Sequence, residues 1–290
     1  MAGGRRIDAV ACAGGGALMA GVEGLVTVIT GAASGIGEAT ARRFSAGGAK
    51  LILGDIQEEQ GQALAAELGA DFRRCDVTDE ADVAALVDLA VDRHGRLDCM
   101  INNAGQLGAI GSITEISDDA WNRTIAILMS SVFYGMKHAG RVMKGQGDGC
   151  ILSTSSVAGI APLGPHAYTA AKHGVIGLTT SVASELAGSG IRVNAVAPGN
   201  APSRMTALAY GGEEEMRKAS AARNPLRRVM EADDVAGAFA YLASADGRNI
   251  TGQVLTLDAG LSACRLDASY YAKASDYVDE AGPSAKSGSR

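Results

Sequence analysis

"LVTVITGAASGIG" (residues 25–37) decides the fold, because a short β-branched run passes directly into a glycine-rich turn and then into a helical pattern. A strand, a glycine turn and a helix in this order are typical of the first βαβ unit of a nucleotide-binding fold. Gly31, Gly35 and Gly37 permit a tight turn and let the backbone N–H groups at the start of the helix approach a pyrophosphate. A plain strand-to-helix turn is the alternative, and the rest of the chain has to decide between the two.

Downstream of this loop, short apolar runs alternate with longer amphipathic stretches. Strands are expected at residues 25–30, 50–55, 71–76, 97–102, 149–155, 191–197 and 253–258. Helices are expected at about 35–47, 57–69, 79–94, 117–143, 166–188 and 232–244. This alternation, together with right-handed crossovers, predicts an α/β fold: a doubly wound, mostly parallel seven-stranded Rossmann-type sheet with helices on both faces.

We interpret residues 22–264 as a single domain, because no Pro/Ser-rich linker and no internal repeat divides them. Within it, residues 200–230 interrupt the strand–helix rhythm and are expected to form a lid or binding loop. Residues 265–290 form a polar tail. Residues 1–21 combine Arg5-Arg6 with a short apolar stretch, as an export signal does. Asp8 and a run of three glycines favour a disordered or artefactual leader instead.

The composition indicates a globular protein that acts on small molecules. The 290 residues are 47% hydrophobic and 20% charged, with a formal net charge of −6. The absence of a basic run argues against a nucleic-acid or anionic-membrane partner, and no apolar run is long enough to span a bilayer. Five dispersed cysteines and four histidines show no metal-ligand spacing, which predicts no metal site and buried thiols in a reducing, cytoplasmic location.

Acidic and amide side chains end the next three expected strands. Asp55 comes eighteen residues after Gly37, where a carboxylate can accept hydrogen bonds from an adenosine ribose and repel a 2′-phosphate. This favours NAD over NADP, whereas the alternative role for Asp55 is a helix N-cap. Asp76 can meet the adenine or form a cap. In "NNAG" (102–105), Asn102 is expected to brace neighbouring strands and Gly105 to leave room for a ribose.

Tyr168 and Lys172 lie four residues apart in "GPHAYTAAKHG" (164–174), on one face of an expected helix. Lowering a phenol pKa from about 10 to about 7 requires about 4 kcal/mol. An ammonium group about 4–5 Å away supplies on the order of 3–4 kcal/mol at an effective dielectric constant of about 20. The pair can therefore create a phenolate near neutral pH, unless it is only two neighbours on a helix.

Five motifs follow one another in the order found in short-chain dehydrogenases/reductases: "TGAASGIG", Asp55, "NNAG", "YTAAK" and "APGNAPS". Over roughly residues 22–262 the chain resembles members of this family. The resemblance implies that Tyr168 is the general acid/base, that Lys172 binds the nicotinamide ribose and lowers the tyrosine pKa, and that a serine polarises the carbonyl. Counting thirteen positions back from Tyr168 points to Ser155, whereas the surrounding "SSVAG" points to Ser156, which we prefer.

The same resemblance implies that the cofactor is NAD. The residues expected to contact it are Gly31, Ser34, Gly35, Ile36, Gly37, Asp55, Asp76, Val77, Asn103, Ala104, Gly105, Tyr168, Lys172, Pro198, Gly199, Ala201 and Ser203. Two departures from the family stand out. Leu128 occupies the position of an asparagine that helps to relay protons, for which Ser130 or Ser131 can substitute. "LDAG" (257–260) stands where the family usually has two glycines after the aspartate.

The expected function is an NAD-dependent oxidoreductase that interconverts a secondary alcohol and a ketone. Met205, Leu208 and Tyr210 in the expected lid favour an uncharged, partly apolar substrate. A non-catalytic NAD-binding sensor or scaffold is the alternative, and only Leu128 supports it. An enoyl reductase is disfavoured because such enzymes typically place more residues between the tyrosine and the lysine.

The helix expected at 166–188 carries two separate stripes. Small residues form one of them: Ala170, Gly174, Gly177, Ser181 and Ser184. Apolar residues form the other: Val175, Leu178, Val182 and Leu186. One stripe can pack on the sheet while the small residues meet another helix closely. The resemblance implies a homo-oligomer, a dimer or tetramer built on this helix and the one at 117–143, whereas burial within the monomer is the alternative.

Overall fold

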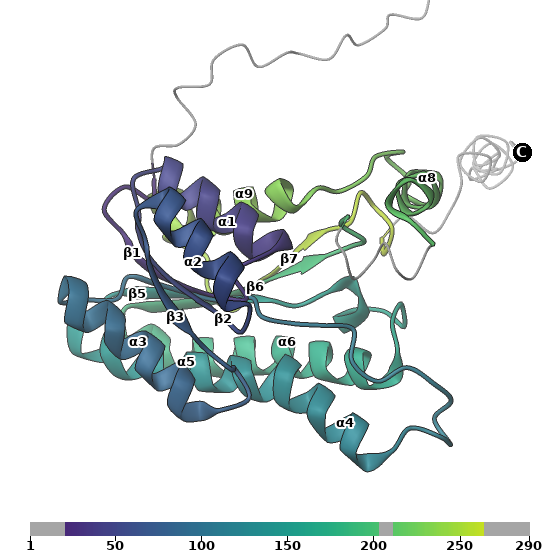
Figure 1. Ribbon diagram of the computed structural model, residues 1–290, viewed down its shortest axis with the longest axis horizontal. Coiled ribbons are helices and arrows are strands. Elements are labelled where there is room, and N and C mark those ends of the chain that lie inside the picture. Colours follow the sequence, from purple (N-terminus) through teal and green to yellow (C-terminus); the bar gives the residue numbers. More distant parts are fainter. Residues whose placement is uncertain (1–20, 203–210, 264–290) are drawn as a thin grey trace, which may run out of the picture.

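Seven parallel strands form the centre of the computed structural model, which describes residues 21–202 and 211–263 (Figure 1). The strands are β1 (Val26–Thr30), β2 (Lys50–Asp55), β3 (Asp71–Arg74), β4 (Cys99–Asn102), β5 (Gly149–Thr154), β6 (Ile191–Pro198) and β7 (Val254–Leu257). Their order in the sheet is β3-β2-β1-β4-β5-β6-β7. The order reverses between β1 and β4, which is where open α/β sheets bind ligands beyond the carboxyl ends of the strands. The predicted doubly wound fold is confirmed.

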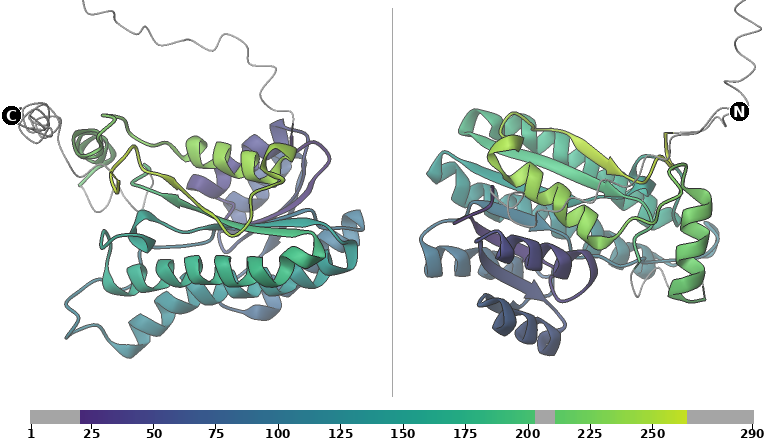
Figure 2. Two further views of the ribbon diagram at one scale, coloured as in Figure 1. Left: turned by 180° about the vertical axis from the view of Figure 1, so that it is seen from behind. Right: turned by 90° about the horizontal axis from the view of Figure 1, so that it is seen from above.

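Helices cover both faces of the sheet (Figures 1 and 2). One layer contains α1 (Gly35–Ala46), α2 (Glu58–Leu68) and α9 (Ala232–Ala243). The other contains α3 (Glu80–His94), α5 (Ser131–Gln146) and α6 (His166–Leu186). The helix α4 (Asp118–Ile125) runs into α5 through a π-helical turn at Ala126–Ser130. Three short 3₁₀ turns, Val157–Gly159, Ala187–Ser189 and Ala245–Gly247, complete the elements outside α8.

The helix α8 (Glu213–Arg223) is the element that the sequence pattern did not reveal. It lies inside the segment 200–230 that was expected to form a lid, and its first turn is acidic, which suits a helix N-terminus. Its apolar pattern is sparse, since only Met216 and Ser220 are buried. Residues 203–210 of that segment lie outside the described residues, as do the expected leader and tail.

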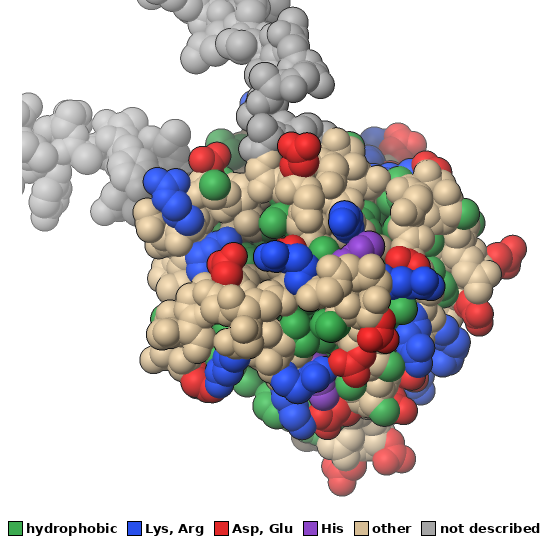
Figure 3. Space-filling view, turned by 90° about the vertical axis from the view of Figure 1, so that its left-hand side faces the viewer, with side chains coloured by type: hydrophobic (Ala, Val, Ile, Leu, Met, Phe, Trp, Pro, Cys, Tyr) green, Lys and Arg blue, Asp and Glu red, His purple; other side chains and the backbone are tan. Residues whose placement is uncertain are grey.

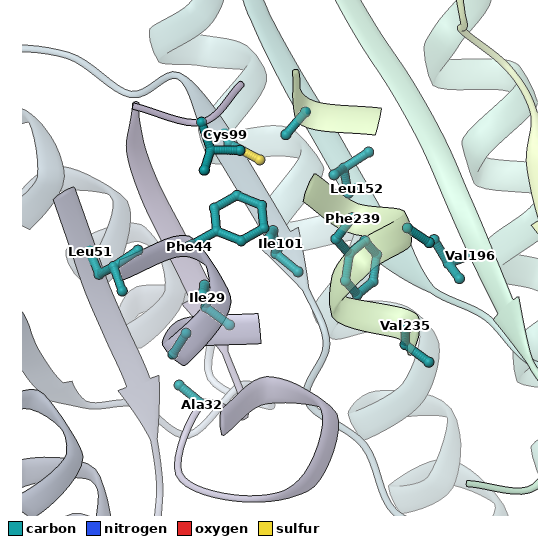
Figure 4. Packing of buried hydrophobic residues seen from close by; sticks show 14 of the residues in the cluster. Ile29, Ala32, Phe44, Leu51, Cys99, Ile101, Leu152, Val196, Val235 and Phe239 are labelled. Carbon is teal, nitrogen blue, oxygen red and sulfur yellow. The ribbon is translucent and has the colours of Figure 1, made fainter. Parts of the chain in front are cut away.

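The core consists of two apolar clusters, one on each face of the sheet. In the first, Phe44 of α1 and Phe239 of α9 pack against Ile29, Ile101 and Leu152 of the strands (Figure 4). The second cluster holds the opposite-facing strand residues against α3, α5 and α6. Strands of a parallel sheet covered on both faces are apolar along their whole length, which explains the continuous apolar runs in the sequence.

The outer surface carries charges of both signs, as the face in Figure 3 shows with acidic and basic side chains interspersed. Exposed ion pairs join neighbouring helices, among them Arg141 of α5 with Asp88 of α3 and Lys144 of α5 with Glu185 of α6. Exposed pairs of this kind contribute about 0–1 kcal/mol each, so the helix layers are held mainly by the core. Across residues 21–202 and 211–263, no helix is both long enough and apolar enough to cross a membrane.

Candidate active site

A cleft of about 1060 Å³ lies at the carboxyl ends of the central strands. Seventeen of the nineteen residue positions named above as catalytic or cofactor-binding candidates line this one cleft. They are Gly31, Ser34, Gly35, Ile36, Asp55, Asp76, Val77, Asn103, Ala104, Gly105, Ser155, Ser156, Tyr168, Lys172, Pro198, Gly199 and Ala201. Gly37 does not line the cleft, and Ser203 lies outside the described residues.

The glycine loop is shaped by close backbone contacts. Gly31 has φ +65°, and a Cβ there would lie 2.6 Å from the Cα of Ala104. A Cβ on Gly37 would lie 1.9 Å from the carbonyl oxygen of Gly31, so the absence of a side chain at Gly37 lets α1 pack closely beneath the loop. Both positions therefore exclude any side chain.

The N-terminus of α1 opens into the cleft. The helix begins at Gly35, and the side chain of its N-cap residue, Ser34, makes no capping hydrogen bond. The first N–H groups of a helix have no partner within it and favour anions such as a pyrophosphate. These features together fit the phosphates of a dinucleotide: the glycine loop, the space beside it and the N-terminus of α1.

Asp55 is buried at the end of β2 and is held by two backbone groups. Its Oδ2 accepts a hydrogen bond of 2.9 Å from the N–H of Ala33, and its Oδ1 accepts one of 2.9 Å from the N–H of Gln57. Gln57 is the N-cap residue of α2, so Asp55 organises the turn before that helix without being its cap. Oδ1 also accepts a longer bond of 3.5 Å from the Nε2 of Gln57, whereas Oδ2 retains a lone pair that a ribose hydroxyl can use.

Asp76 is occupied by the turn that precedes α3. Its Oδ1 accepts hydrogen bonds from the Oγ1 of Thr78 at 2.7 Å and from the N–H of Thr78 at 3.0 Å. These bonds lower the pKa of Asp76. The N-cap of α3 is Asp79 instead, whose side chain accepts from the N–H of Ala81. Asp76 is therefore a turn residue at the wall of the cleft, and the alternative of a helix cap is wrong.

The bracing role expected for Asn102 belongs to Asn103. The Nδ2 of Asn103 donates to the carbonyl oxygens of Thr30 at 3.2 Å and Gly31 at 3.1 Å, and its Oδ1 accepts from the Oγ1 of Thr154 at 3.0 Å. Asn102 makes only a 3.5 Å contact with Ser153. Successive side chains leave a strand in opposite directions, so a shift of one residue exchanges the two roles.

Tyr168 stands in the first turn of α6, close enough to Ser156 for the serine hydroxyl to affect the pKa of the phenol. Ser156 lies two residues beyond the end of β5, and its Oγ accepts a bond of 3.1 Å from the N–H of Ala158. Burial raises the pKa of Tyr168, and the hydroxyl of Ser156 opposes this rise. The lowering that we expected from Lys172 is not produced by the described residues, because burial disfavours the phenolate.

Lys172 is almost fully enclosed. Its Nζ lies 5.6 Å from the centre of the Tyr168 ring and donates a hydrogen bond of 2.7 Å to the carbonyl oxygen of Thr154. Burial lowers the pKa of Lys172 to about 8. An ammonium group carries three protons, so the Nζ can also donate to ribose hydroxyls in the cleft.

The two candidate serines point in different directions. The hydroxyl of Ser155 donates a bond of 3.1 Å to the backbone carbonyl of Lys172, whereas that of Ser156 lies near Tyr168. Of the two alternatives left open by the sequence, this geometry favours Ser156 as the group that meets a substrate oxygen.

Leu128 lies in the π-helical turn, has no exposed surface and lines the cleft. A Cβ on Gly105 would lie 3.2 Å from its Cδ2, so Leu128 also limits the space beside Gly105. Neither expected substitute for the missing asparagine lines the cleft, and the hydroxyl of Ser131 donates to the carbonyl of Ile127 at 2.6 Å. This placement gives no support to a relay through Ser130 or Ser131, which stays a prediction.

Sequence reasoning missed Thr154, although it is central to the site. Its carbonyl holds Lys172, and its hydroxyl holds Asn103. A threonine at a strand end is unremarkable in a sequence, because both interactions are with residues far along the chain. Gln57 and Arg123, which also line the cleft, gave no signal for the same reason.

Comparisons with known proteins agree with this geometry. A family model described as enoyl-(acyl carrier protein) reductase matches residues 31–262. Momilactone A synthase of Oryza sativa subsp. japonica is 44% identical over 247 residues, which cover 82% of this chain and 90% of that protein. A mitochondrial borneol dehydrogenase of Lavandula x intermedia is 43% identical over 83% of this chain and 92% of its own. The crystal structure of levodione reductase superposes with a TM-score of 0.79 at 35% identity, covering 83% of this chain and 98% of that one.

Proposed function

The chain belongs to the short-chain dehydrogenase/reductase family, and from this premise we propose that it is an NAD-dependent enzyme that interconverts a secondary alcohol and a ketone. The observation that carries the proposal is the arrangement at the cleft wall. Tyr168 lies near the hydroxyl of Ser156, and the buried ammonium group of Lys172 lies beside its ring. A sensor or scaffold has no need to bury a lysine beside a phenol in this way.

Each group has a separate task in the proposed reaction. Tyr168 exchanges a proton between its Oη and the substrate hydroxyl, as a general acid/base positioned within hydrogen-bond reach. Ser156 holds the substrate oxygen through its Oγ. Lys172 holds the nicotinamide ribose through its Nζ. NAD⁺, when bound, supplies the hydride acceptor and a positive ring, whose charge favours the phenolate that burial disfavours.

Asp55 supports the choice of NAD over NADP. Its carboxylate is anchored by Ala33 and Gln57 at the end of β2. A 2′-phosphate on the adenosine ribose would therefore meet a negative charge at this position. Asp55 also has Ile56 and Gln57 as its neighbours on the cleft wall, which bring no positive charge. We propose that the adenosine ribose bonds to Asp55.

The substrate that we propose is uncharged and partly apolar. Ile160 and Leu163 are large apolar side chains that remain exposed on the segment between Ser156 and Tyr168. Names of relatives point the same way, since two of them are borneol dehydrogenases and a third is zerumbone synthase. The lid residues Met205, Leu208 and Tyr210 lie outside the described residues and do not contribute to this argument.

Enoyl thioester reduction is the second candidate, because the matching family model carries that description. Tyr168 and Lys172 are four residues apart on one helix, which supports alcohol oxidation instead. The two activities are separated by following NADH at 340 nm with a panel of secondary alcohols that includes borneol, with their ketones, and with an enoyl thioester. NADH formation from an alcohol supports the proposal. Binding of NADH without turnover of any compound would indicate a cofactor sensor.

We further propose that copies of the chain associate through α5 and α6. The small residues Ala170, Gly177, Ser181 and Ser184 are exposed on α6, which disfavours the alternative that this stripe is buried within the monomer. Phe133 of α5 is 46% exposed. Light scattering on the purified chain measures the assembly.

A cytoplasmic location is also proposed. The described cysteines, Cys75, Cys99 and Cys150, are buried and unpaired, as thiols in a reducing compartment are expected to be. One relative is named as mitochondrial, so fractionation of cells that express the tagged chain is the appropriate test.

A further inference from the structure

Ser155 neighbours the proposed substrate-binding serine, yet its hydroxyl bonds to a helix backbone. The Oγ donates to the carbonyl oxygen of Lys172 at 3.1 Å, and the side chain is 1% exposed. The backbone N–H of Ser155 donates to the carbonyl of Val196 at 2.7 Å, so the residue is anchored to β6. The hydroxyl therefore ties a fixed point of the sheet to α6.

Lys172 is tied to the same strand end a second time. Its Nζ donates to the carbonyl of Thr154 at 2.7 Å, while its own carbonyl accepts from Ser155. The side chain and the backbone of Lys172 are thus bonded to two consecutive residues, Thr154 at the end of β5 and Ser155 directly after it. The two bonds fix both the position of this helical turn and the direction of its lysine.

Gly159 closes this junction. A Cβ on Gly159 would lie 2.7 Å from the carbonyl oxygen of Lys172 and 2.7 Å from the Oγ of Ser155. The 3₁₀ turn Val157–Gly159 therefore packs directly on the hydrogen bond and excludes water from it. The carbonyl of Lys172 lies inside α6 and also accepts an N–H of its own helix, so the hydroxyl of Ser155 uses its second lone pair and adds a tie to the sheet that no solvent molecule can replace.

We propose that Ser155 is a positioning residue for the oxidoreductase reaction, an inference that rests on the proposed function. Its hydroxyl, enclosed by Gly159, holds the turn of α6 that carries Lys172. Tyr168, one turn earlier on the same helix, is thereby held at its distance from Ser156. Ser155 does not touch the substrate, because its proton is already donated to the carbonyl of Lys172.

A matched control exists on the same helix. Thr179 is fully buried, and its Oγ1 donates to the carbonyl of Val175 at 2.8 Å. This bond stays within α6 and joins it to no other element. Thr179→Val removes a buried hydroxyl from the same helix with almost no change of shape, whereas Ser155→Ala removes the tie to the sheet.

Steady-state kinetics and amide hydrogen exchange of wild type, Ser155→Ala, Thr179→Val and Ser156→Ala test the proposal. We expect kcat to fall about ten- to a hundred-fold in Ser155→Ala, the loss typical of small displacements of catalytic groups, with the KM for the alcohol nearly unchanged. Amides of residues 172–176 should exchange faster than in wild type. Thr179→Val should keep the wild-type kcat, and Ser156→Ala should lose turnover and raise the KM.

Support requires both the loss of kcat and the faster exchange in Ser155→Ala. A wild-type kcat, or unchanged exchange, would overturn the positioning role. A raised alcohol KM in Ser155→Ala, with near-normal kinetics in Ser156→Ala, would overturn it in favour of substrate contact by Ser155. Failure of the wild-type protein to turn over any compound would remove the proposed function, while amide exchange would still decide whether Ser155 ties α6 to the sheet.

Discussion

The Nζ of Lys172 donates a hydrogen bond of 2.7 Å to the carbonyl of Thr154, so an ammonium group lies buried at the carboxyl end of β5. One carbonyl compensates only part of the hydration that this cation loses on folding. The pKa of Lys172 falls to about 8 for this reason. Function thus places a destabilising charge in the core, and the cost can be measured.

Lys172→Met should stabilise the protein at pH 7. The fall in pKa from 10.5 to about 8 corresponds to about 3 kcal/mol at 1.36 kcal/mol per unit. Below pH 8 both folded and unfolded chains carry the proton, so the wild type bears the full cost. Between about 8 and 10.5 only the unfolded chain binds it, and the free energy of unfolding of the wild type rises with pH.

Urea unfolding at pH 7 and pH 9.5 measures this difference. The advantage of Lys172→Met should shrink at the higher pH. Lys144→Met is the control, because Lys144 is exposed and paired with Glu185 at the surface. An advantage of Lys172→Met that is independent of pH would contradict a depressed pKa.

Tyr168→Phe should remove the transferable proton while keeping the ring that packs beside Lys172. Turnover is expected to fall about 10²- to 10⁴-fold, the usual contribution of general acid–base catalysis. NADH binding, followed by fluorescence titration, should persist. The exposed Tyr241 of α9 provides the control Tyr241→Phe, which should behave as wild type. Near-native turnover in Tyr168→Phe would leave the pair as two neighbours on a helix.

Asp55→Ala should weaken NADH binding by about 1–3 kcal/mol, the range for losing a charged hydrogen-bond partner. The loop also loses the acceptor for the N–H groups of Ala33 and Gln57, which adds to the effect. Relative affinity for NADPH should rise, because the negative charge is gone. Calorimetric titration with both cofactors provides the measurement. Equal affinities of the wild type for NADH and NADPH would exclude the role of Asp55 in selection.

Leu128→Asn should leave the NADH dissociation constant nearly unchanged and lower the free energy of unfolding by about 1–3 kcal/mol, because it buries an amide among apolar atoms. A rise in turnover would show that the asparagine restores proton delivery to Lys172. Leu128→Met conserves volume without adding a polar group and separates packing from chemistry. Loss of soluble protein in Leu128→Asn alone would identify Leu128 as a core residue.

Ala259→Gly should stabilise the protein by up to about 1 kcal/mol. Ala259 has φ +52°, a left-handed conformation that costs a residue with a Cβ about 1–2 kcal/mol. Glycine avoids this cost, but its greater conformational freedom in the unfolded chain offsets part of the gain in stability. The melting temperature reports the change. Ala222→Gly, in the exposed last turn of α8, should lower it instead. A lower melting temperature for Ala259→Gly would contradict a net conformational cost at Ala259.

The local pattern of apolar and polar residues determined the architecture of this protein and the location of its candidate site. Short β-branched runs and amphipathic stretches placed all seven strands and the seven helices other than α8 to within a few residues, although α4 and α5 were expected as one helix. Burial on both faces of a parallel sheet leaves a clear periodicity. The spacing of Tyr168 and Lys172, and the glycine loop with Asp55, are equally local. Only α8, with few apolar residues, escaped this approach.

Tertiary contacts decided which partner each of two neighbouring residues meets. Ser155 and Ser156 are adjacent in sequence, as are Asn102 and Asn103, and the choice within each pair depends on the element that packs opposite. The upward shift of the Tyr168 pKa likewise follows from burial, which depends on the whole fold around the ring. Sequence spacing determines which residues share a face of one helix or strand. The direction in which a side chain points, and the loss of its hydration, are decided only when distant segments pack around it.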